Sequence, residues 1–370
     1  MVFAERHKAV CKLLSRKGIR HYFTTKAEDI RYLSGFRGED SALILGPAGM
    51  TVITDSRYLE EAKEAAKAPV RDGVKTGVVL WAGTGLAQAA VKFVRGRRVT
   101  VGVEENSLTV SLWRSLRKAL RGRGKTKPVD YPVAQVRRIK DERELALIRK
   151  AIMVAEQAMM EVRPALKPGL RERHVAMMLY NAMAAHGAEG PSFPTIVASG
   201  PGASRPHYET SDKKIKAGEA VLIDWGAKVN GYMSDLTRVV FMGRIATHAG
   251  RAYETLVTAR NRAIAAIKGG ADARNTDLAA RGAIEEAGYK GRFTHSLGHG
   301  IGLEIHEGPH IGPRSKDKLV PGMVFTIEPG IYVPGKWGLR LEDDFAVNAH
   351  GEAERLGRLP FDTEWAVADC

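Results

Sequence analysis

Cysteine is scarce in this chain of 370 residues, which holds only Cys11 and Cys370, far apart in the sequence. Two distant cysteines do not make a disulfide framework, so the small secreted domains that depend on several disulfides are excluded. A bond between the two would require the chain ends to meet, and we predict none. Such low cysteine content fits a reducing compartment, and the expected location is cytoplasmic.

Long apolar runs are also missing. No run approaches the roughly 20 residues needed to cross a bilayer, so we expect no membrane partner. The segment from Met1 to Lys8 lacks the uninterrupted apolar core of a signal peptide, and we expect none. With 44% hydrophobic and 27% charged residues, the chain has an ordinary globular composition and is long enough for two domains.

Acidic residues are fewer than basic ones: the chain has 42 Asp and Glu and 57 Lys and Arg, which gives a formal net charge of +15. A basic excess can indicate nucleic-acid binding. The densest basic run, from Arg114 to Lys127, lies at the end of a predicted helix and in a Gly-containing loop, without interleaved aromatic residues. We therefore interpret the excess as cations spread over solvated surface and expect no nucleic-acid partner.

The first third of the chain alternates short apolar runs with amphipathic segments. Strands are predicted at 21–25, 41–46, 50–55, 77–81 and 99–104. Helices are predicted at 5–17, 29–33, 58–68, 85–95 and 107–122. These elements indicate a βα-rich first domain with a mixed sheet, covering residues 1–135.

A second domain is predicted over residues 136–370. Acidic residues from Asp141 to Glu144 favour the start of a long helix ending near residue 163, because they complement the helix dipole. Further helices are predicted at 171–186, 248–268 and 275–287, backing a curved antiparallel sheet, so the fold class is α+β. Several methionines occur at helical spacing and are interpreted as core residues. They are Met153, Met159, Met160, Met177, Met178 and Met183.

Four carboxylates and one histidine of the second domain lie in or beside apolar, strand-like sequence. They are Asp224, Asp235, His299, Glu328 and Glu342. Lone carboxylates are costly to bury unless they are paired or bound to a metal. This oxygen-rich set suits two divalent ions such as Mn²⁺, with Zn²⁺ or Co²⁺ as alternatives.

The first two of these acids can be placed by geometry. Asn230-Gly231 between two apolar runs predicts a hairpin with a type I′ turn. With this turn, Gly226 pairs with Asp235, and Asp224 shares the face of Gly226. Asp224 and Asp235 are then diagonal neighbours about 7–8 Å apart at the backbone, close enough for both side chains to reach one metal pair.

In this order the motifs resemble those of the pita-bread metallopeptidases, the group that contains aminopeptidase P, prolidase and methionine aminopeptidase. The resemblance covers most of the chain. The phrases from Asp29 to Phe36 and from Thr54 to Tyr58 are similar to the N-terminal domain of the aminopeptidase P, prolidase and creatinase branch. The resemblance implies a creatinase/prolidase-like α/β domain followed by a pita-bread catalytic domain.

The resemblance also implies a role for each ligand. Asp224 would chelate one metal, Asp235 and Glu342 would bridge both, and His299 and Glu328 would hold the second metal. Glu328 would also be the general base, taking the proton of the attacking water and passing it to the leaving nitrogen.

Further residues are implicated in substrate binding. By the resemblance, His207 and His306 face the substrate around the scissile bond and assist catalysis, and His295 lines the pocket. Arg340 lies two residues before Glu342 on an extended strand, and its side chain points the same way, where it can orient a ligand. Asp343 alternates to the other face and is predicted to be structural.

The implied activity is that of an Xaa-Pro aminopeptidase, a metal-dependent exopeptidase that cleaves between an N-terminal residue and proline with a hydroxide activated by two metals. The alternative is an Xaa-Pro dipeptidase, or prolidase, which needs a cation for the free carboxylate of its substrate. Several prolidases carry an arginine directly after a His-Glu-x-Pro motif, where this chain has His310, so we favour the aminopeptidase and include His310 among the substrate-binding candidates.

A non-catalytic peptide- or nucleic-acid-binding protein of the same fold is the remaining hypothesis. Such relatives have typically lost metal ligands, whereas all five are present here. The expected partner is a proline-containing peptide substrate, and a homodimer is left open.

Overall fold

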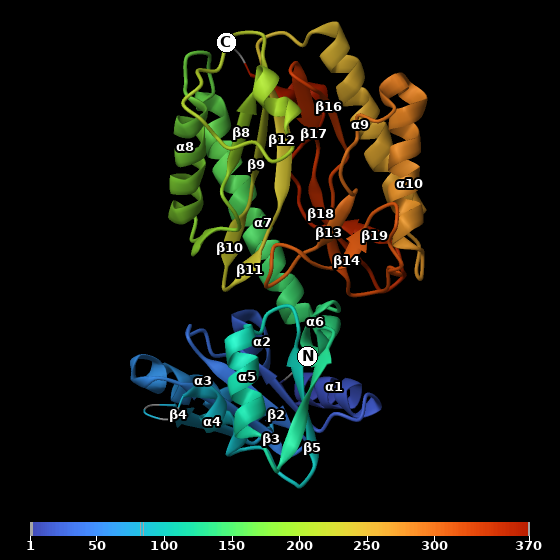
Figure 1. Ribbon diagram of the computed structural model, residues 1–370. Coiled ribbons are helices and arrows are strands. Elements are labelled where there is room, and N and C mark those ends of the chain that lie inside the picture. Colours follow the sequence, from blue (N-terminus) through green and yellow to red (C-terminus); the bar gives the residue numbers. More distant parts are fainter. Residues whose placement is uncertain (1–2, 82, 84, 369–370) are drawn as a thin grey trace. The chain divides into compact units, whose positions relative to one another are not determined.

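The computed structural model describes residues 3–81, 83 and 85–368 (Figure 1). The expectations about a signal peptide and a disulfide depend in part on Met1, Val2 and Cys370, which lie outside the described residues. Contacts divide the chain between Arg137 and Arg138 into two compact units, here unit 1 and unit 2. We propose this junction as the domain boundary that the sequence predicts after residue 135.

The centre of unit 1 is a six-stranded sheet of β1 (His21–Thr24), β2 (Ala42–Gly46), β3 (Gly49–Thr54), β4 (Thr76–Leu80), β5 (Val99–Glu104) and β6 (Gly124–Val129). The order is β4-β3-β2-β1-β5-β6. β1 pairs antiparallel with β2 and parallel with β5, which in turn pairs parallel with β6. The sheet is therefore mixed, as predicted.

The helices of unit 1 are α1 (Phe3–Arg16), α2 (Ala27–Ser34), α3 (Leu59–Arg71), α4 (Leu86–Val91), α5 (Val110–Ala119) and α6 (Pro132–Arg137). β6 and α6 were missed, and in the case of β6 the run from Arg114 to Lys127 was interpreted as helix end and loop. The physical reason is that β6 is an edge strand with largely exposed side chains, so its lysines obscure the apolar alternation on which strand prediction depends.

Unit 2 contains two larger sheets. One consists of β8 (Ile196–Ser199), β9 (Ala220–Trp225), β12 (Leu236–Met242) and β20 (Val367–Ala368). The other consists of β13 (Gly298–Gly300), β14 (Glu307–Ile311), β15 (Val324–Ile327), β18 (Asp343–Val347) and β19 (Ala353–Arg355). An isolated bridge from Thr237 to Glu342 joins them. All named pairs except β12 with β20 are antiparallel. The structure has several linked sheets where a single curved sheet was predicted.

Smaller pieces complete the strand set. β7 (Gly190–Pro191), β10 (Ala227–Val229) and β11 (Tyr232–Met233) form a three-stranded sheet, and β16 (Gly330–Val333) pairs with β17 (Trp337–Arg340). The predicted hairpin is confirmed, because Val229 pairs with Tyr232 and the same register continues from β10–β11 into β9–β12. Asn230 and Gly231 both have positive φ, 46° and 73°, as a type I′ turn requires.

Two pairs of helices back these strands: α7 (Glu142–Val162) with α8 (Glu172–Ala185), and α9 (Thr247–Ala266) with α10 (Ala273–Ile284). A short α11 (Thr363–Ala366) precedes β20. The first pair shares an apolar core with β9 and β12, and the second pair shares one with β15 and β18 (Figure 1). The combination confirms the α+β class. No helix in the described part of the chain is both long and apolar enough to cross a membrane.

The methionine prediction is partly wrong. Met159 and Met183 are buried in the core between α7 and α8. Met153, Met160 and Met177 are instead 47–53% exposed on the outer faces of these helices. Helical spacing alone does not distinguish the inner face from the outer one when methionines occur on both.

Candidate metal centre

The first two acids enter the site from the long hairpin. Asp224 lies near the end of β9, opposite Thr237 of β12, and Asp235 immediately precedes β12. They are 7% and 5% exposed. The backbone N–H of Asp235 donates to Oδ2 of Asp344 over 3.0 Å, which holds this turn of chain against β18. The hairpin therefore brings the two buried carboxylates close together, as predicted.

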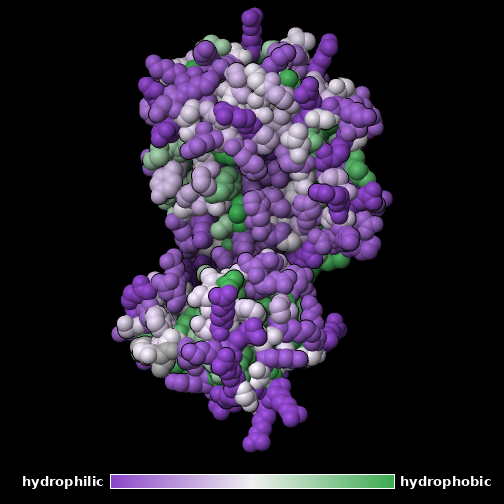
Figure 2. Space-filling view, in the orientation of Figure 1, coloured by the Kyte–Doolittle hydropathy of each residue, from purple (hydrophilic) through white to green (hydrophobic). Residues whose placement is uncertain are grey.

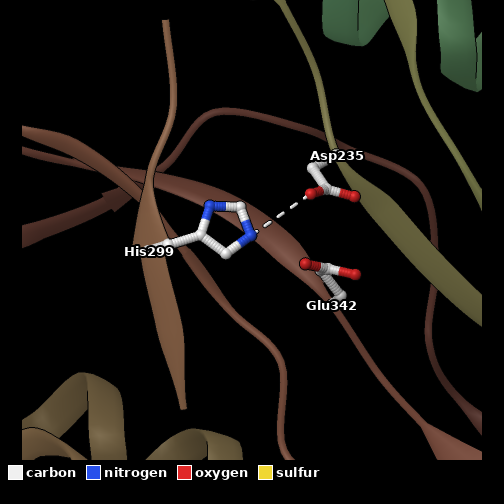
Figure 3. Close-up of side chains that lie close together, drawn as sticks. All are labelled: Asp235, His299 and Glu342. Carbon is white, nitrogen blue, oxygen red and sulfur yellow. Dashed lines mark ion pairs between the residues drawn. The ribbon is translucent and has the colours of Figure 1, made fainter. Parts of the chain in front are cut away.

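The other three residues come from the second sheet and its neighbours. His299 lies in β13, Glu328 follows β15, and Glu342 lies between β17 and β18. Asp235, His299 and Glu342 each offer one ligand atom, and these atoms lie within 4.8 Å of one another. Figure 3 shows the three side chains pointing toward a common centre from three different strands or connections.

Glu328 and Asp224 border the same centre. His299 Nε2 lies 3.5 Å from Asp235 Oδ2 and 3.8 Å from Glu328 Oε1. Asp224 is joined to Glu342 through Arg340, which contacts both carboxylates. All five residues also line one cavity. The structure thus brings the five predicted ligands together, although they span more than a hundred residues of sequence.

The tautomer of His299 suits a metal ligand. Its Nδ1 lies 3.1 Å from the carbonyl oxygen of Gly300, to which it donates. Nε2 then carries a lone pair and faces the carboxylates, as a ligand nitrogen must. Burial first, and then the neighbouring His306, lowers the pKa of His299 to about 4, so the ring is neutral at physiological pH.

The carboxyl groups repel one another. Burial raises the pKa of all four, and neighbouring acids further raise that of Asp235, Glu328 and Glu342. The pKa of Glu342 rises to about 8, through burial and then through Asp224. After burial, the charge of Glu342 is the largest cause of the raised pKa of Asp235 and of Glu328. Arg340 is the one guanidinium lining the described cavity, and a single cation does not compensate four carboxylates.

Arg340 organises a network that sequence reasoning only partly anticipated. It contacts Asp224 through Nη2 and donates from Nε to Thr237 Oγ1 and from Nη1 to the Tyr332 hydroxyl, each over 3.0 Å. Thr237 in turn donates to Glu342 Oε2 over 2.6 Å. Thr237 and Tyr332 were missed. Thr237 could have been found, because it lies two residues after Asp235 and shares its strand face.

The residues fit a pair of cations. Oδ1 of Asp224 is buried and has no hydrogen-bond partner among the described residues. Its other oxygen is bound by Arg340, so one oxygen of this cavity-lining carboxylate is left without a donor. A buried anionic oxygen without a donor is unfavourable by several kcal/mol unless a cation approaches it. One imidazole and four carboxylates form the mixed N and O donor set that divalent ions such as Mn²⁺ accept.

A cavity of about 710 Å³ opens over this centre. The predicted substrate residues all line it: His207, His295, His306, His310 and Arg340. The rings of His299 and His306 are 4.3 Å apart, nearly perpendicular. His310 Nε2 lies 3.1 Å from Ser296 Oγ.

His295 is bound on both sides. Its Nδ1 lies 2.8 Å from the Ser296 carbonyl oxygen and its Nε2 lies 2.8 Å from the Tyr332 hydroxyl. Burial, and then Arg340, lowers its pKa to about 3, so the ring is neutral. Since the Tyr332 hydroxyl also accepts from Arg340, His295 supports the ligand network as well as lining the cavity.

Asp343, next to Glu342, takes no part in the cavity lining. It lies 1% exposed between Arg238, Arg260 and Arg355, each within 2.9 Å of one of its oxygens. Burial alone would raise the pKa of Asp343, but the three guanidinium groups outweigh burial and hold the pKa below its ordinary value. As predicted, Asp343 lies outside the ligand cluster, among three guanidinium groups.

Comparisons with known proteins agree with this geometry. Residues 146–349 match the model of metallopeptidase family M24, and residues 6–139 match the creatinase/prolidase N-terminal domain. Peptidase YqhT of Bacillus subtilis is 35% identical over 340 residues, covering 92% of this chain and 94% of the relative.

Solved structures cover nearly the whole chain. The Xaa-Pro dipeptidase from Bacillus anthracis has a TM-score of 0.90 at 32% identity, covering 97% of this chain and 98% of that one. The X-Pro aminopeptidase from Thermotoga maritima has a TM-score of 0.85 at 34% identity, covering 96% and 99%. The chain therefore belongs to metallopeptidase family M24, with a creatinase/prolidase N-terminal domain followed by the pita-bread peptidase domain.

Proposed function

We propose that this peptidase removes the N-terminal residue from peptides whose second residue is proline. Asp224, Asp235, His299, Glu328 and Glu342 would hold two divalent ions, with Asp235 and Glu342 as the bridging pair. Convergence of these five side chains in one buried centre supports the proposal. Such ions, when bound, acidify a water molecule and polarise the substrate carbonyl.

The chain's own residues would manage the protons and the substrate. Glu328 accepts the proton of the attacking water and delivers it to the proline nitrogen, which is tertiary and must be protonated to leave. His306 and His207 donate to the carbonyl oxygen as negative charge develops on it. Burial, then His207, lowers the pKa of His306, so it acts as a neutral donor.

The preference for longer peptides depends on the charge of the cavity wall. A free dipeptide carboxylate needs an uncommitted cation, but the guanidinium of Arg340 is 4% exposed and already binds Asp224, Thr237 and Tyr332. No other Lys or Arg lines the described cavity. The wall therefore favours a substrate whose chain continues beyond proline without a charge.

Dipeptidase activity is the second candidate, because the similar Bacillus anthracis structure bears the name Xaa-Pro dipeptidase. His310 would then have to bind the substrate carboxylate. His310 lines the cavity, so this role is sterically open to it.

Hydrolysis of Gly-Pro and of Gly-Pro-Xaa peptides with Mn²⁺ separates the two activities. We expect a higher kcat/KM for the longer peptides. His310→Arg should raise kcat/KM for Gly-Pro by about tenfold or more, because a charged contact typically contributes about 1.5–3 kcal/mol. His310→Gln is the matched uncharged control. A wild-type enzyme that cleaves only dipeptides would establish the dipeptidase instead.

We further propose Mn²⁺ as the native metal and the cytoplasm as the location, in line with the oxygen-rich ligand set and with the unpaired Cys11. Activity of the metal-free protein reconstituted with Mn²⁺, Zn²⁺ or Co²⁺ tests the first. Light scattering on the full chain tests the homodimer that the sequence leaves open.

A further inference from the structure

Most of the net positive charge of this protein lies in unit 1. Residues 1–137 contain 26 Lys and Arg against 13 Asp and Glu, whereas residues 138–370 contain 31 against 29. A general compositional bias would raise the basic content of both units. The excess of unit 1 therefore calls for a local explanation.

Most of this excess belongs to three segments around neighbouring parallel strands. Residues 10–25, 86–103 and 106–129 together contain 15 Lys and Arg and no Asp or Glu. They surround β1, β5 and β6, which lie side by side in the order β1-β5-β6 and run parallel. Parallel strands begin at the same edge of a sheet, so the basic loops that precede them lie together.

Contacts join the three loops directly. His21 Nε2, at the start of β1, lies 3.1 Å from the backbone N of Arg95. The Arg123 guanidinium, just before β6, donates to the carbonyl oxygens of Val91 and Val94 over 3.3 and 3.2 Å.

Further contacts come from the other cations. Lys127 Nζ donates to the carbonyl of Lys17 over 2.9 Å. Nη1 of Arg20 lies 3.8 Å from the position that a Cβ would take on Gly96. The loops before β1, β5 and β6 thus form one continuous surface.

Eight exposed cations make up this surface, which we call the basic edge. They are Arg16, Lys17, Arg20, Arg95, Arg97, Arg98, Arg121 and Lys125. None of them forms an ion pair with a carboxylate in the part of the chain that the structure describes. Figure 2 shows strongly hydrophilic side chains projecting from the end of unit 1 where β5 begins.

We propose that the basic edge binds the phosphate backbone of nucleic acid without sequence preference. Three strands about 4.8 Å apart spread the charge over about 10 Å before side-chain length is added, which is too wide for one small anion. Six of the eight cations are arginines, whose planar guanidinium group matches phosphate oxygens in pairs. Such contacts supply most of non-specific nucleic-acid affinity.

An anionic membrane surface is the main competitor for such a patch. Peripheral membrane segments combine cations with apolar side chains that enter the headgroup region. The loops at 16–20, 95–98 and 121–125 hold none of the large apolar side chains that are exposed in the described chain. The basic edge therefore offers charge alone, which favours a polymer of phosphates.

We therefore expect a nucleic-acid partner, which the run from Arg114 to Lys127 alone, at a helix end and in a loop, did not indicate. Tertiary structure adds the loops from Arg16 to Arg20 and from Arg95 to Arg98 beside that run. Helix C-termini also attract cations, which accounts for Arg16 at the end of α1, but not for the three arginines that follow α4 by several residues.

The test uses the full chain and a fluorescein-labelled 20-base-pair DNA duplex, with anisotropy measured from 50 to 200 mM salt. Eight phosphate contacts predict a slope of log K against log salt of about −7. The triple variant Arg97→Ser, Arg98→Ser, Arg121→Ser should make this slope shallower by about 3 and weaken binding about tenfold or more.

The control variant Arg251→Ser, Lys268→Ser, Lys290→Ser removes the same charge from exposed positions of unit 2 and should leave slope and affinity unchanged. Thermal unfolding of both variants shows that each is folded. Equal weakening by both triples, or a wild-type slope shallower than about −2, would overturn the proposal. Tighter binding to phosphatidylglycerol vesicles than to the duplex at the same salt would assign the basic edge to a membrane instead.

Discussion

Thr237 shows how much a single hydroxyl group can contribute to this site. It accepts from Arg340 and donates to Glu342, so it fixes the orientation of a ligand carboxylate in a buried position. We predict that Thr237→Val, which keeps the shape but removes the hydroxyl, lowers metal affinity about 10–100-fold. Thr237→Ser should restore most of it. Metal titration of both metal-free variants is the measurement, and equal affinity of Thr237→Val and wild type would contradict the role.

His299 and His306 lie with their rings in contact, yet we assign them different roles. His306→Ala should retain both metals and lose about 10²–10³ in kcat, because a donor to the developing oxyanion is removed. His299→Ala should lose metal, because the ligand nitrogen is gone. Metal content measured beside kcat for an Xaa-Pro-Xaa peptide separates the two. A metal-depleted His306→Ala protein would show that the assignment is reversed.

At the scale of elements, Asp343 holds together pieces of chain that carry the ligands. Its three arginine partners lie in β12, in α9 and in β19, and Arg238 also donates to the carbonyl oxygens of Thr237 and Glu342. Asp343 therefore supports the isolated bridge from Thr237 to Glu342 that joins the two larger sheets.

We predict that Asp343→Asn lowers the free energy of unfolding by about 3–5 kcal/mol, because buried guanidinium groups lose their counter-charge. Folded protein should still bind two metals. Asp272→Asn, at a half-exposed pair with Lys318, is the control and should change stability by less than about 1 kcal/mol. Chemical denaturation gives both values, and equal small losses would exclude the structural role of Asp343.

At the scale of the whole molecule, four carboxylates in one centre make the metal-free protein sensitive to pH. Glu342 has an ordinary pKa of 4.5, and in the folded protein burial and Asp224 raise it to about 8. Between these values the folded state binds more protons than the unfolded state, so stability falls as pH rises. Divalent ions should reverse the trend, since they favour the ionised carboxylates.

We therefore expect the Tm of chelator-treated protein to fall from pH 5 to pH 8, and the Tm increase produced by Mn²⁺ to grow over the same range. A change of about 1 kcal/mol would shift Tm by about 2–4 °C in a domain of this size. Scanning calorimetry at four pH values measures both trends. A metal-free Tm that rises with pH would mean that the acids are compensated within the protein.

Much of this protein is determined by its sequence. Local patterns place β1–β5 and the long helices to within a few residues, and Asn230-Gly231 specifies the turn and the register that make Asp224 and Asp235 neighbours. These features depend on short-range physics: apolar alternation, helix caps and a turn with two positive φ values.

Other features were decided only by tertiary structure, because they depend on which distant segments meet. The links from Thr237 to Glu342 and from Tyr332 to His295 join residues 105 and 37 positions apart. β6 forms a strand because it pairs with β5, and not because of an apolar pattern of its own. The basic edge exists because three parallel strands begin side by side. This arrangement cannot be predicted from any single stretch of the sequence.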